Sequence, residues 1–263
     1  MEAKKIVTAE ILSNRPIAKG IMELKLLAPE SASQAKPGQF VNVYTGDSSL
    51  LLPRPISICD ADDTTLTLIY AVVGKGTAWF ADCCVGQELR VSTPLGNGFD
   101  VSVVREGDTA LLIGGGIGSC PLLKLGKVLK EKGVKLNVAI GFRDEPFLEE
   151  EFRALGANVV VATDSGRVGY HGTALAAAMD AGMDCEHWFT CGPKIMLKFV
   201  AKEAMARGRD AQVSMEERMG CGYGACVGCV VDVLERGAEA PVRKKVCKDG
   251  PVFLGSEVFF DEQ

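Results

Sequence analysis

The sequence predicts an α+β multidomain protein with three parts. Short strand-like runs broken by Pro, Gly, Asn and Asp fill residues 1–105, which is typical of a small antiparallel β-barrel. Across residues 106–210, buried apolar runs alternate with helical segments, which indicates an α/β domain with a doubly wound parallel sheet. Residues 211–263 are Gly-rich, irregular and contain four regularly spaced cysteines, which indicates a small metal-cluster domain.

The barrel prediction rests on strand candidates at residues 6–12, 21–26, 40–44 and 66–71, with little helix between them. Within this part, Arg54-Pro55-Ile56-Ser57 places a guanidinium and a hydroxyl on a segment that proline stiffens. Arginine offers a planar set of donors that suits phosphate oxygens. The glycines and Thr77 of Gly74-Lys75-Gly76-Thr77 precede a short predicted helix and can present N–H groups to a second phosphate. The alternative is a solvated edge strand with an incidental arginine.

The middle part begins with the apolar run Ala110–Ile113, which is typical of a strand buried on both faces. Gly114-Gly115-Gly116-Ile117-Gly118 follows, and a helix is predicted from Pro121 to Lys132. This turn resembles a dinucleotide fingerprint, although the last glycine position holds Ser119 or Pro121. A glycine turn needed only for packing is the alternative. Cys191-Gly192-Pro193 ends a later predicted strand, where open α/β sheets bind ligands, although Cys191 could equally be a small buried residue.

The cysteine-rich part has the spacing C-x4-C-x2-C followed by one distant cysteine: Cys221, Cys226, Cys229 and Cys247. Plant-type 2Fe–2S ferredoxins space their four thiolate ligands in this way. The alternatives are a structural zinc site, which usually has two short cysteine pairs, or free buried thiols.

Composition limits the classes of function. The net charge of −5 argues against a nucleic-acid partner, which would need a basic face. The sequence has neither a signal-peptide pattern nor an 18-residue apolar run, so no membrane span is expected. Ten cysteines without a secretion signal favour a reducing, cytoplasmic location. His171 and His187 have no telling neighbours, and no catalytic residue is predicted, because bound cofactors can carry redox chemistry alone.

These motifs occur in the order found in ferredoxin–NADP reductase-like flavoproteins. Two further segments point to a more specific family within this group. They are the segment from Glu216 to Cys226 and the run Val246-Cys247-Lys248-Asp249-Gly250-Pro251-Val252-Phe253. Over nearly its whole length, the chain resembles the electron-transfer subunits of dihydroorotate dehydrogenase B.

This resemblance implies a cofactor for each part. FAD would bind the barrel at Arg54, Pro55, Ile56, Ser57, Ile69, Tyr70, Ala71, Gly76 and Thr77. NAD, as co-substrate, would bind the middle domain at Gly114, Gly115, Gly116, Gly118, Cys191, Gly192 and Pro193. A 2Fe–2S cluster would be held by Cys221, Cys226, Cys229 and Cys247.

The resemblance also implies a partner, an FMN-containing catalytic chain that oxidises dihydroorotate to orotate in pyrimidine biosynthesis, with two copies of each chain. Electrons would run from FMN through the cluster and FAD to NAD⁺, so the chain would be an oxidoreductase subunit. Arg143 could meet the 2′-phosphate of NADP whereas Asp144 or Glu145 would repel it, and NAD is favoured mainly by the family. The rivals are a small subunit of a ferredoxin:NAD(P) oxidoreductase or sulfide dehydrogenase, and a redox-sensing or zinc-stabilised binding module.

Overall fold

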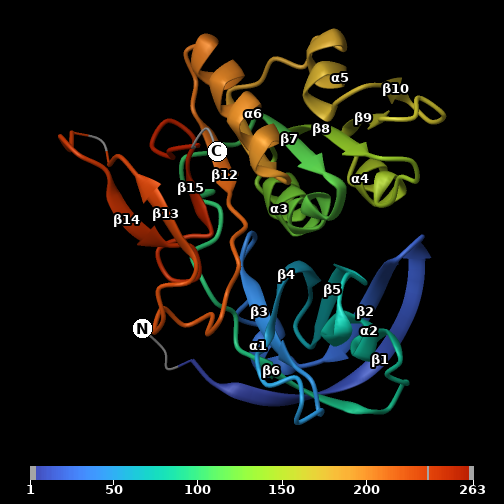
Figure 1. Ribbon diagram of the computed structural model, residues 1–263. Coiled ribbons are helices and arrows are strands. Elements are labelled where there is room, and N and C mark those ends of the chain that lie inside the picture. Colours follow the sequence, from blue (N-terminus) through green and yellow to red (C-terminus); the bar gives the residue numbers. More distant parts are fainter. Residues whose placement is uncertain (1–3, 236, 261–263) are drawn as a thin grey trace.

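The structure, a computed structural model, describes residues 4–235 and 237–260. Figure 1 shows the barrel on one side, the α/β layers on the other, and the cysteine-rich part packed beside both. The three-part fold class is therefore confirmed. No helix in the described ranges is long and apolar enough to cross a membrane.

The barrel is closed, and its strands follow the order β1-β2-β5-β4-β3-β6. The strands are β1 (Ile6–Ala18), β2 (Ile21–Leu27), β3 (Phe40–Tyr44), β4 (Arg54–Ala61), β5 (Thr65–Ala71) and β6 (Glu88–Ser92). Two short helices accompany them, α1 (Pro29–Ala32) and α2 (Lys75–Ala81). Apolar side chains such as Ile11, Leu24, Val43 and Leu68 fill the interior, as the alternation along each strand requires.

The α/β part is a seven-stranded sheet in the order β10-β9-β8-β7-β11-β12-β15. Its strands are β7 (Thr109–Gly115), β8 (Lys135–Phe142), β9 (Asn158–Thr163), β10 (Tyr170–His171), β11 (His187–Cys191), β12 (Ala211–Ser214) and β15 (Val252–Leu254). The helical elements are η1 (Gly116–Ser119), α3 (Cys120–Glu131), α4 (Glu149–Ala154), α5 (Ala174–Asp180) and α6 (Lys194–Ala206). All strand pairs are parallel except β12 with β15.

The cysteine-rich part has one hairpin of its own, β13 (Val230–Val233) with β14 (Val242–Lys245). The strands β12 and β15 lie beyond residue 210 in the chain but extend the parallel sheet. The chain thus returns to the α/β sheet after the cysteine loop, which fixes that loop between two anchored strands. The domain boundaries predicted from the sequence stay predictions.

The barrel and the α/β part share an apolar interface. Ile69 and Phe99 from the barrel side belong to the same buried cluster as Leu122 and Phe189 of the sheet and its helices. Polar contacts add to it: Lys124 Nζ on α3 donates to the Ala61 carbonyl at 3.0 Å, and Lys127 pairs with Asp60. This packing sets how the barrel faces the carboxyl ends of the parallel strands.

Candidate functional site

The first predicted motif lies on β4, with Arg54 at the start of that strand. The guanidinium of Arg54 donates to the Leu50 carbonyl at 3.3 Å and to the Leu52 carbonyl. A Cβ at position 76 would lie 2.5 Å from Arg54 Nη2, so only glycine leaves room for the guanidinium. The fold therefore brings together Arg54 and Gly76, two residues that the sequence predicted as cofactor contacts in separate motifs.

Thr77 holds the turn before α2. Its Oγ1 accepts hydrogen bonds from the backbone N–H of Val73 at 2.9 Å and of Gly74 at 3.1 Å. This arrangement keeps Gly76 beneath the Arg54 side chain. The pair forms a cationic cradle that suits the pyrophosphate of a dinucleotide, since arginine binds phosphate oxygens through parallel donors.

The three residues of β5 that were predicted to line the flavin lie in three different surroundings. The Tyr70 side chain points into the barrel core, where it packs edge-on against Phe80 and donates to Asn14 Oδ1 at 3.4 Å. Ile69 lies in the interface with the α/β part, and Ala71 is half-buried. Tyr70 can therefore meet a flavin only through its backbone.

The two glycine motifs of the α/β part meet at the carboxyl ends of β7 and β11. These strands are adjacent, with Cys191 directly opposite Gly114. A Cβ at Gly118 would lie 2.6 Å from the Gly192 Cα, so the two loops are in close backbone contact. Open parallel sheets bind nucleotides at this edge, and the predicted residues 114–118 and 191–193 are gathered there.

Glu216 lies near this edge and was not singled out as a site residue from the sequence. Although the residue is solvent-accessible, partial burial of its carboxyl raises its pKa. Burial and, after it, the charge of Glu216 raise the pKa of the Cys191 thiol, and the same carboxylate acts on the buried Cys120. A sequence signal was present, because Glu216 lies two residues after the end of the strand β12. That Glu216 lies close to Cys191 could not be predicted without knowing that β11 and β12 are adjacent in the sheet.

The four predicted cluster cysteines converge in two pairs. The side chains of Cys221 and Cys226 interact with one another, and so do those of Cys229 and Cys247. Cys229 and Cys247 are buried, whereas Cys221 and Cys226 are partly exposed. The first pair comes from one loop, and the second joins that loop to the segment after β14.

Backbone groups in the loop surround the Cys221 sulfur. The backbone N–H groups of Tyr223 and Cys226 each donate to Cys221 Sγ at 3.4 Å. Burial pushes the pKa of Cys221 upward, but hydrogen bonds led by the Cys226 N–H outweigh it and lower the pKa to about 6. Burial and then the neighbouring Cys229 raise the pKa of Cys247 to about 12.

Two pairs of thiols suit a 2Fe–2S cluster better than a zinc ion. Structural zinc needs four ligands around a single centre. A 2Fe–2S cluster has two irons and four cysteine ligands, and N–H groups directed at sulfur are the hydrogen bonds that tune such clusters. The residues therefore fit the cluster.

Two asparagines of the barrel part attach the cysteine-rich part, and sequence reasoning missed both. Asn42 Nδ2 on β3 donates to the Cys221 carbonyl at 2.9 Å. Asn97 Nδ2, after β6, donates to the carbonyls of Lys248 at 3.2 Å and Asp249 at 3.1 Å. Asn42 thus holds the backbone of the predicted ligand Cys221, and Asn97 holds the backbone that follows the predicted ligand Cys247.

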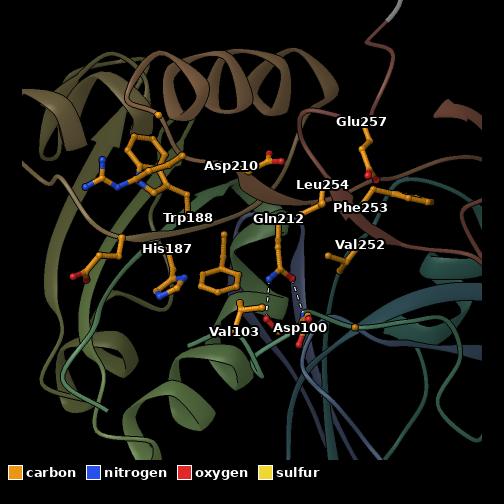
Figure 2. Close-up of a pocket in the computed structure, with 15 residues that line it drawn as sticks. Asp100, Val103, His187, Trp188, Asp210, Gln212, Val252, Phe253, Leu254 and Glu257 are labelled. Carbon is orange, nitrogen blue, oxygen red and sulfur yellow. Dashed lines mark hydrogen bonds between the residues drawn. The ribbon is translucent and has the colours of Figure 1, made fainter. Parts of the chain in front are cut away.

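A pocket of about 640 Å³ lies at the opposite edge of the sheet (Figure 2). It is lined by the first residues of β11, including His187 and Trp188, by Asp210 just before β12, and by Gln212 within β12. Gln212 and the backbone of Asp100 exchange hydrogen bonds at 2.7 and 2.8 Å across it. None of the predicted cofactor residues lines this pocket, and it lies at the amino ends of the parallel strands, away from the nucleotide edge.

Comparison with known proteins gives consistent matches over most of the chain. Residues 216–259 match a family model described as the iron-sulfur cluster binding domain of dihydroorotate dehydrogenase B. A Streptococcus mutans protein named dihydroorotate dehydrogenase B (NAD(+)), electron transfer subunit, is 40% identical over 255 residues, which is 95% of this chain and 97% of the relative. A Lysinibacillus sphaericus protein of the same name is 44% identical over 248 residues, 92% of this chain and 94% of the relative.

Solved structures with the same fold include two reductases. An NADH-dependent reduced ferredoxin-NADP oxidoreductase, described in the context of flavin-based electron bifurcation, superposes with a TM-score of 0.84 at 29% identity, covering 97% of this chain and 90% of that one. A ferredoxin reductase of carbazole 1,9a-dioxygenase has a TM-score of 0.65 at 20% identity, covering 78% of this chain and 67% of that one. The second likeness shows the fold alone.

Proposed function

Because the chain belongs to the family of dihydroorotate dehydrogenase B electron transfer subunits, we propose that it carries electrons from a dihydroorotate-oxidising partner to NAD⁺. The observation that carries the proposal is the arrangement of three sites in one chain: a cationic cradle on the barrel, a nucleotide edge on the sheet, and a paired thiol set between two anchored strands. The chain would act as an oxidoreductase subunit, with dihydroorotate chemistry on the partner.

The chain's own residues would bind and orient the cofactors. Arg54 and the turn before α2 would hold the FAD pyrophosphate, with Ser57 and the β5 backbone toward the flavin ring. Residues 114–118 and 191–193 would bind NAD at the sheet edge. Cys221, Cys226, Cys229 and Cys247 would hold the 2Fe–2S cluster. When bound, FAD supplies hydride exchange with the nicotinamide and the cluster supplies one-electron transfer.

The partner in this proposal is a separate FMN-containing chain, with two copies of each chain in the assembly and a cytoplasmic location. Ten free cysteines, all in the described part of the chain, are consistent with a reducing compartment. The relatives' name supports the existence of a catalytic partner.

A second candidate is a small subunit of a ferredoxin:NADP-linked complex, favoured by the likeness to the NADH-dependent reduced ferredoxin-NADP oxidoreductase. Its identity to this chain is 29%, against 40 to 44% for the dihydroorotate dehydrogenase B subunits, so we favour the latter.

The test is isolation of the tagged chain with its native partners, followed by an assay of dihydroorotate-dependent NAD⁺ reduction. We expect an FMN-containing partner and activity that disappears in the Cys226→Ser variant. NADH-driven reduction of the flavin should persist in that variant, since it needs only the barrel and the sheet. Partner-free purification, or a complex that reduces NAD⁺ from reduced ferredoxin but not from dihydroorotate, would refute the proposal.

A further inference from the structure

The cysteine loop contacts the barrel at the strand that neighbours the predicted flavin motif. Figure 1 shows the chain between β12 and β13 descending beside the barrel near β3. The Asn42 side chain on β3 donates to the carbonyl of the predicted ligand Cys221 at 2.9 Å. Within the barrel, β3 pairs with β4, and Asn42 lies opposite Pro55 in the segment Arg54–Ser57. One residue therefore touches both the cluster loop and the flavin-binding strand.

The Asn42 amide is held tightly in place. The residue is fully buried, and its backbone N–H donates to Ser92 Oγ at 2.9 Å. Within the described residues, Asn42 Oδ1 is buried without a hydrogen-bond partner. An unpaired buried acceptor costs stability, so packing alone would favour an apolar residue among the neighbouring valines of β3. The polar side chain is explained by its hydrogen bond to the Cys221 carbonyl and by its contact with the Tyr223 hydroxyl in the same loop.

The loop is shaped to receive this amide. Gly222 has φ +74, and a Cβ there would lie 2.5 Å from Asn42 Nδ2 and 2.7 Å from Oδ1. Glycine is the residue that adopts this conformation without strain and also leaves space for the amide. A second contact joins β3 to the cysteine loop, because the hydroxyls of Tyr44 on β3 and Tyr223 in the loop lie 3.1 Å apart.

We propose that Asn42 is a positioning residue for electron transfer between cluster and flavin, holding the Cys221 peptide against the strand beside the flavin motif. The inference rests on the proposed function. The step moves one electron between the two bound groups and forms or breaks no bond in the chain. Because the hydrogen bond reaches the Cys221 carbonyl and not the sulfur, it acts by fixing the loop backbone, whose N–H groups at Tyr223 and Cys226 point at Cys221 Sγ. Hydrogen bonds to the sulfur stabilise the more negative, reduced cluster.

Asn97 provides a matched control within the same chain. Its side chain also ties the barrel part to the cysteine-rich part, but through the carbonyls of Lys248 and Asp249, which are not cluster ligands. Its backbone N–H keeps a further bond to Gly250 O at 2.6 Å, so removing the side chain leaves that attachment in place. A purely structural role predicts similar effects for Asn42 and Asn97.

The test compares Asn42→Leu, Asn42→Asp and Asn97→Ala in the FAD- and cluster-loaded protein. In Asn42→Leu we expect a lower cluster reduction potential and a changed electron paramagnetic resonance spectrum after dithionite reduction. Iron release to a chelator should accelerate about tenfold, the factor that corresponds to losing one buried hydrogen bond. Asn42→Asp is nearly isosteric, but a buried carboxyl without a cation readily takes up a proton, so this variant is measured at alkaline pH. There the ionised carboxylate lacks the donor and adds a negative charge, which should lower the potential further. NADH-driven flavin reduction should be unchanged in both.

In Asn97→Ala, potential and spectrum should match the native protein. A native potential and spectrum in both Asn42 variants, or equal changes in Asn97→Ala, would overturn the inference. If Asn42→Leu does not assemble a cluster, the reduction potential and spectrum of Asn42→Asp test the inference instead. A native protein without any dithionite-dependent cluster signal would instead refute the proposed function, so the two failures are distinguishable.

Discussion

The contact between Gly76 and Arg54 gives the sharpest prediction for cofactor binding. In Gly76→Ala the new methyl group would lie 2.5 Å from Arg54 Nη2 and closer still to Arg54 Nε and Cζ. The three atoms nearest to the methyl group all belong to the end of the flexible Arg54 side chain, so Arg54 can swing away and the fold can survive. The perturbation therefore acts on the direction of the guanidinium.

The expected loss follows from the donors that Arg54 would direct at a phosphate. Hydrogen bonds to charged groups contribute about 1.5–3 kcal/mol each, so losing one weakens FAD binding by about 10- to 150-fold. The assay is titration of the FAD-depleted protein with FAD, followed by flavin fluorescence, together with thermal unfolding of the same sample. We expect weaker FAD binding with little change in the unfolding of the FAD-free protein.

Gly74→Ala is the matched control, two residues away in the same turn. No atom lies within 4 Å of a Cβ at that position, and its φ of −165 is extended backbone that any residue adopts. This variant should bind FAD as the native protein does. Equal FAD affinities for Gly76→Ala and Gly74→Ala would refute the placement of the pyrophosphate beside Arg54.

Two further predictions concern the nucleotide edge. In Gly118→Ala the methyl group would meet the rigid backbone of residues 191 and 192, so KM for NADH should rise and the protein should lose stability. The control is Gly126→Ala in α3, where the methyl group would meet mainly side chains. An unchanged KM in Gly118→Ala would contradict the placement of the nucleotide site. Glu216 has a raised pKa, so the folded chain keeps a proton that the unfolded chain releases near pH 4.5, and native stability falls as pH rises through this window. The stability advantage of Glu216→Gln over the native protein should therefore grow from near zero at pH 4.5 toward neutral pH, and a constant difference in thermal unfolding across that range would contradict it.

Local sequence patterns predicted much of the fold. The alternation in residues 6–12 and 21–26 predicted barrel strands because one face of each strand must be apolar, and β1 and β2 confirm it. The cysteine spacing predicted a four-thiolate site because Cys221, Cys226 and Cys229 are near neighbours in sequence and the more distant Cys247 completes the ferredoxin pattern. The apolar run at 110–113 likewise appears as the buried strand β7.

Contacts between distant segments were not predictable from the same patterns. The Asn42 amide meets Cys221, and the Arg54 guanidinium meets Gly76, only because the strand order of the barrel and the path of the cysteine loop bring them together. One signal was present: Asn42 interrupts the apolar run Phe40-Val41-Asn42-Val43, and a buried polar residue in such a strand needs a partner. The addition of β12 and β15 to the parallel sheet also depends on long-range pairing that short-range periodicity does not encode.

The central claim is that one chain holds a flavin and a 2Fe–2S cluster that exchange electrons with NADH. The most direct measurement is anaerobic addition of NADH to the purified protein, with absorbance, electron paramagnetic resonance and metal content recorded on the same sample. The account predicts iron without zinc, FAD released on denaturation, bleaching of the flavin, and the resonance of a reduced 2Fe–2S cluster. A colourless protein with stoichiometric zinc, or a flavin that NADH reduces without any reduced-cluster signal appearing even after addition of dithionite, would contradict it.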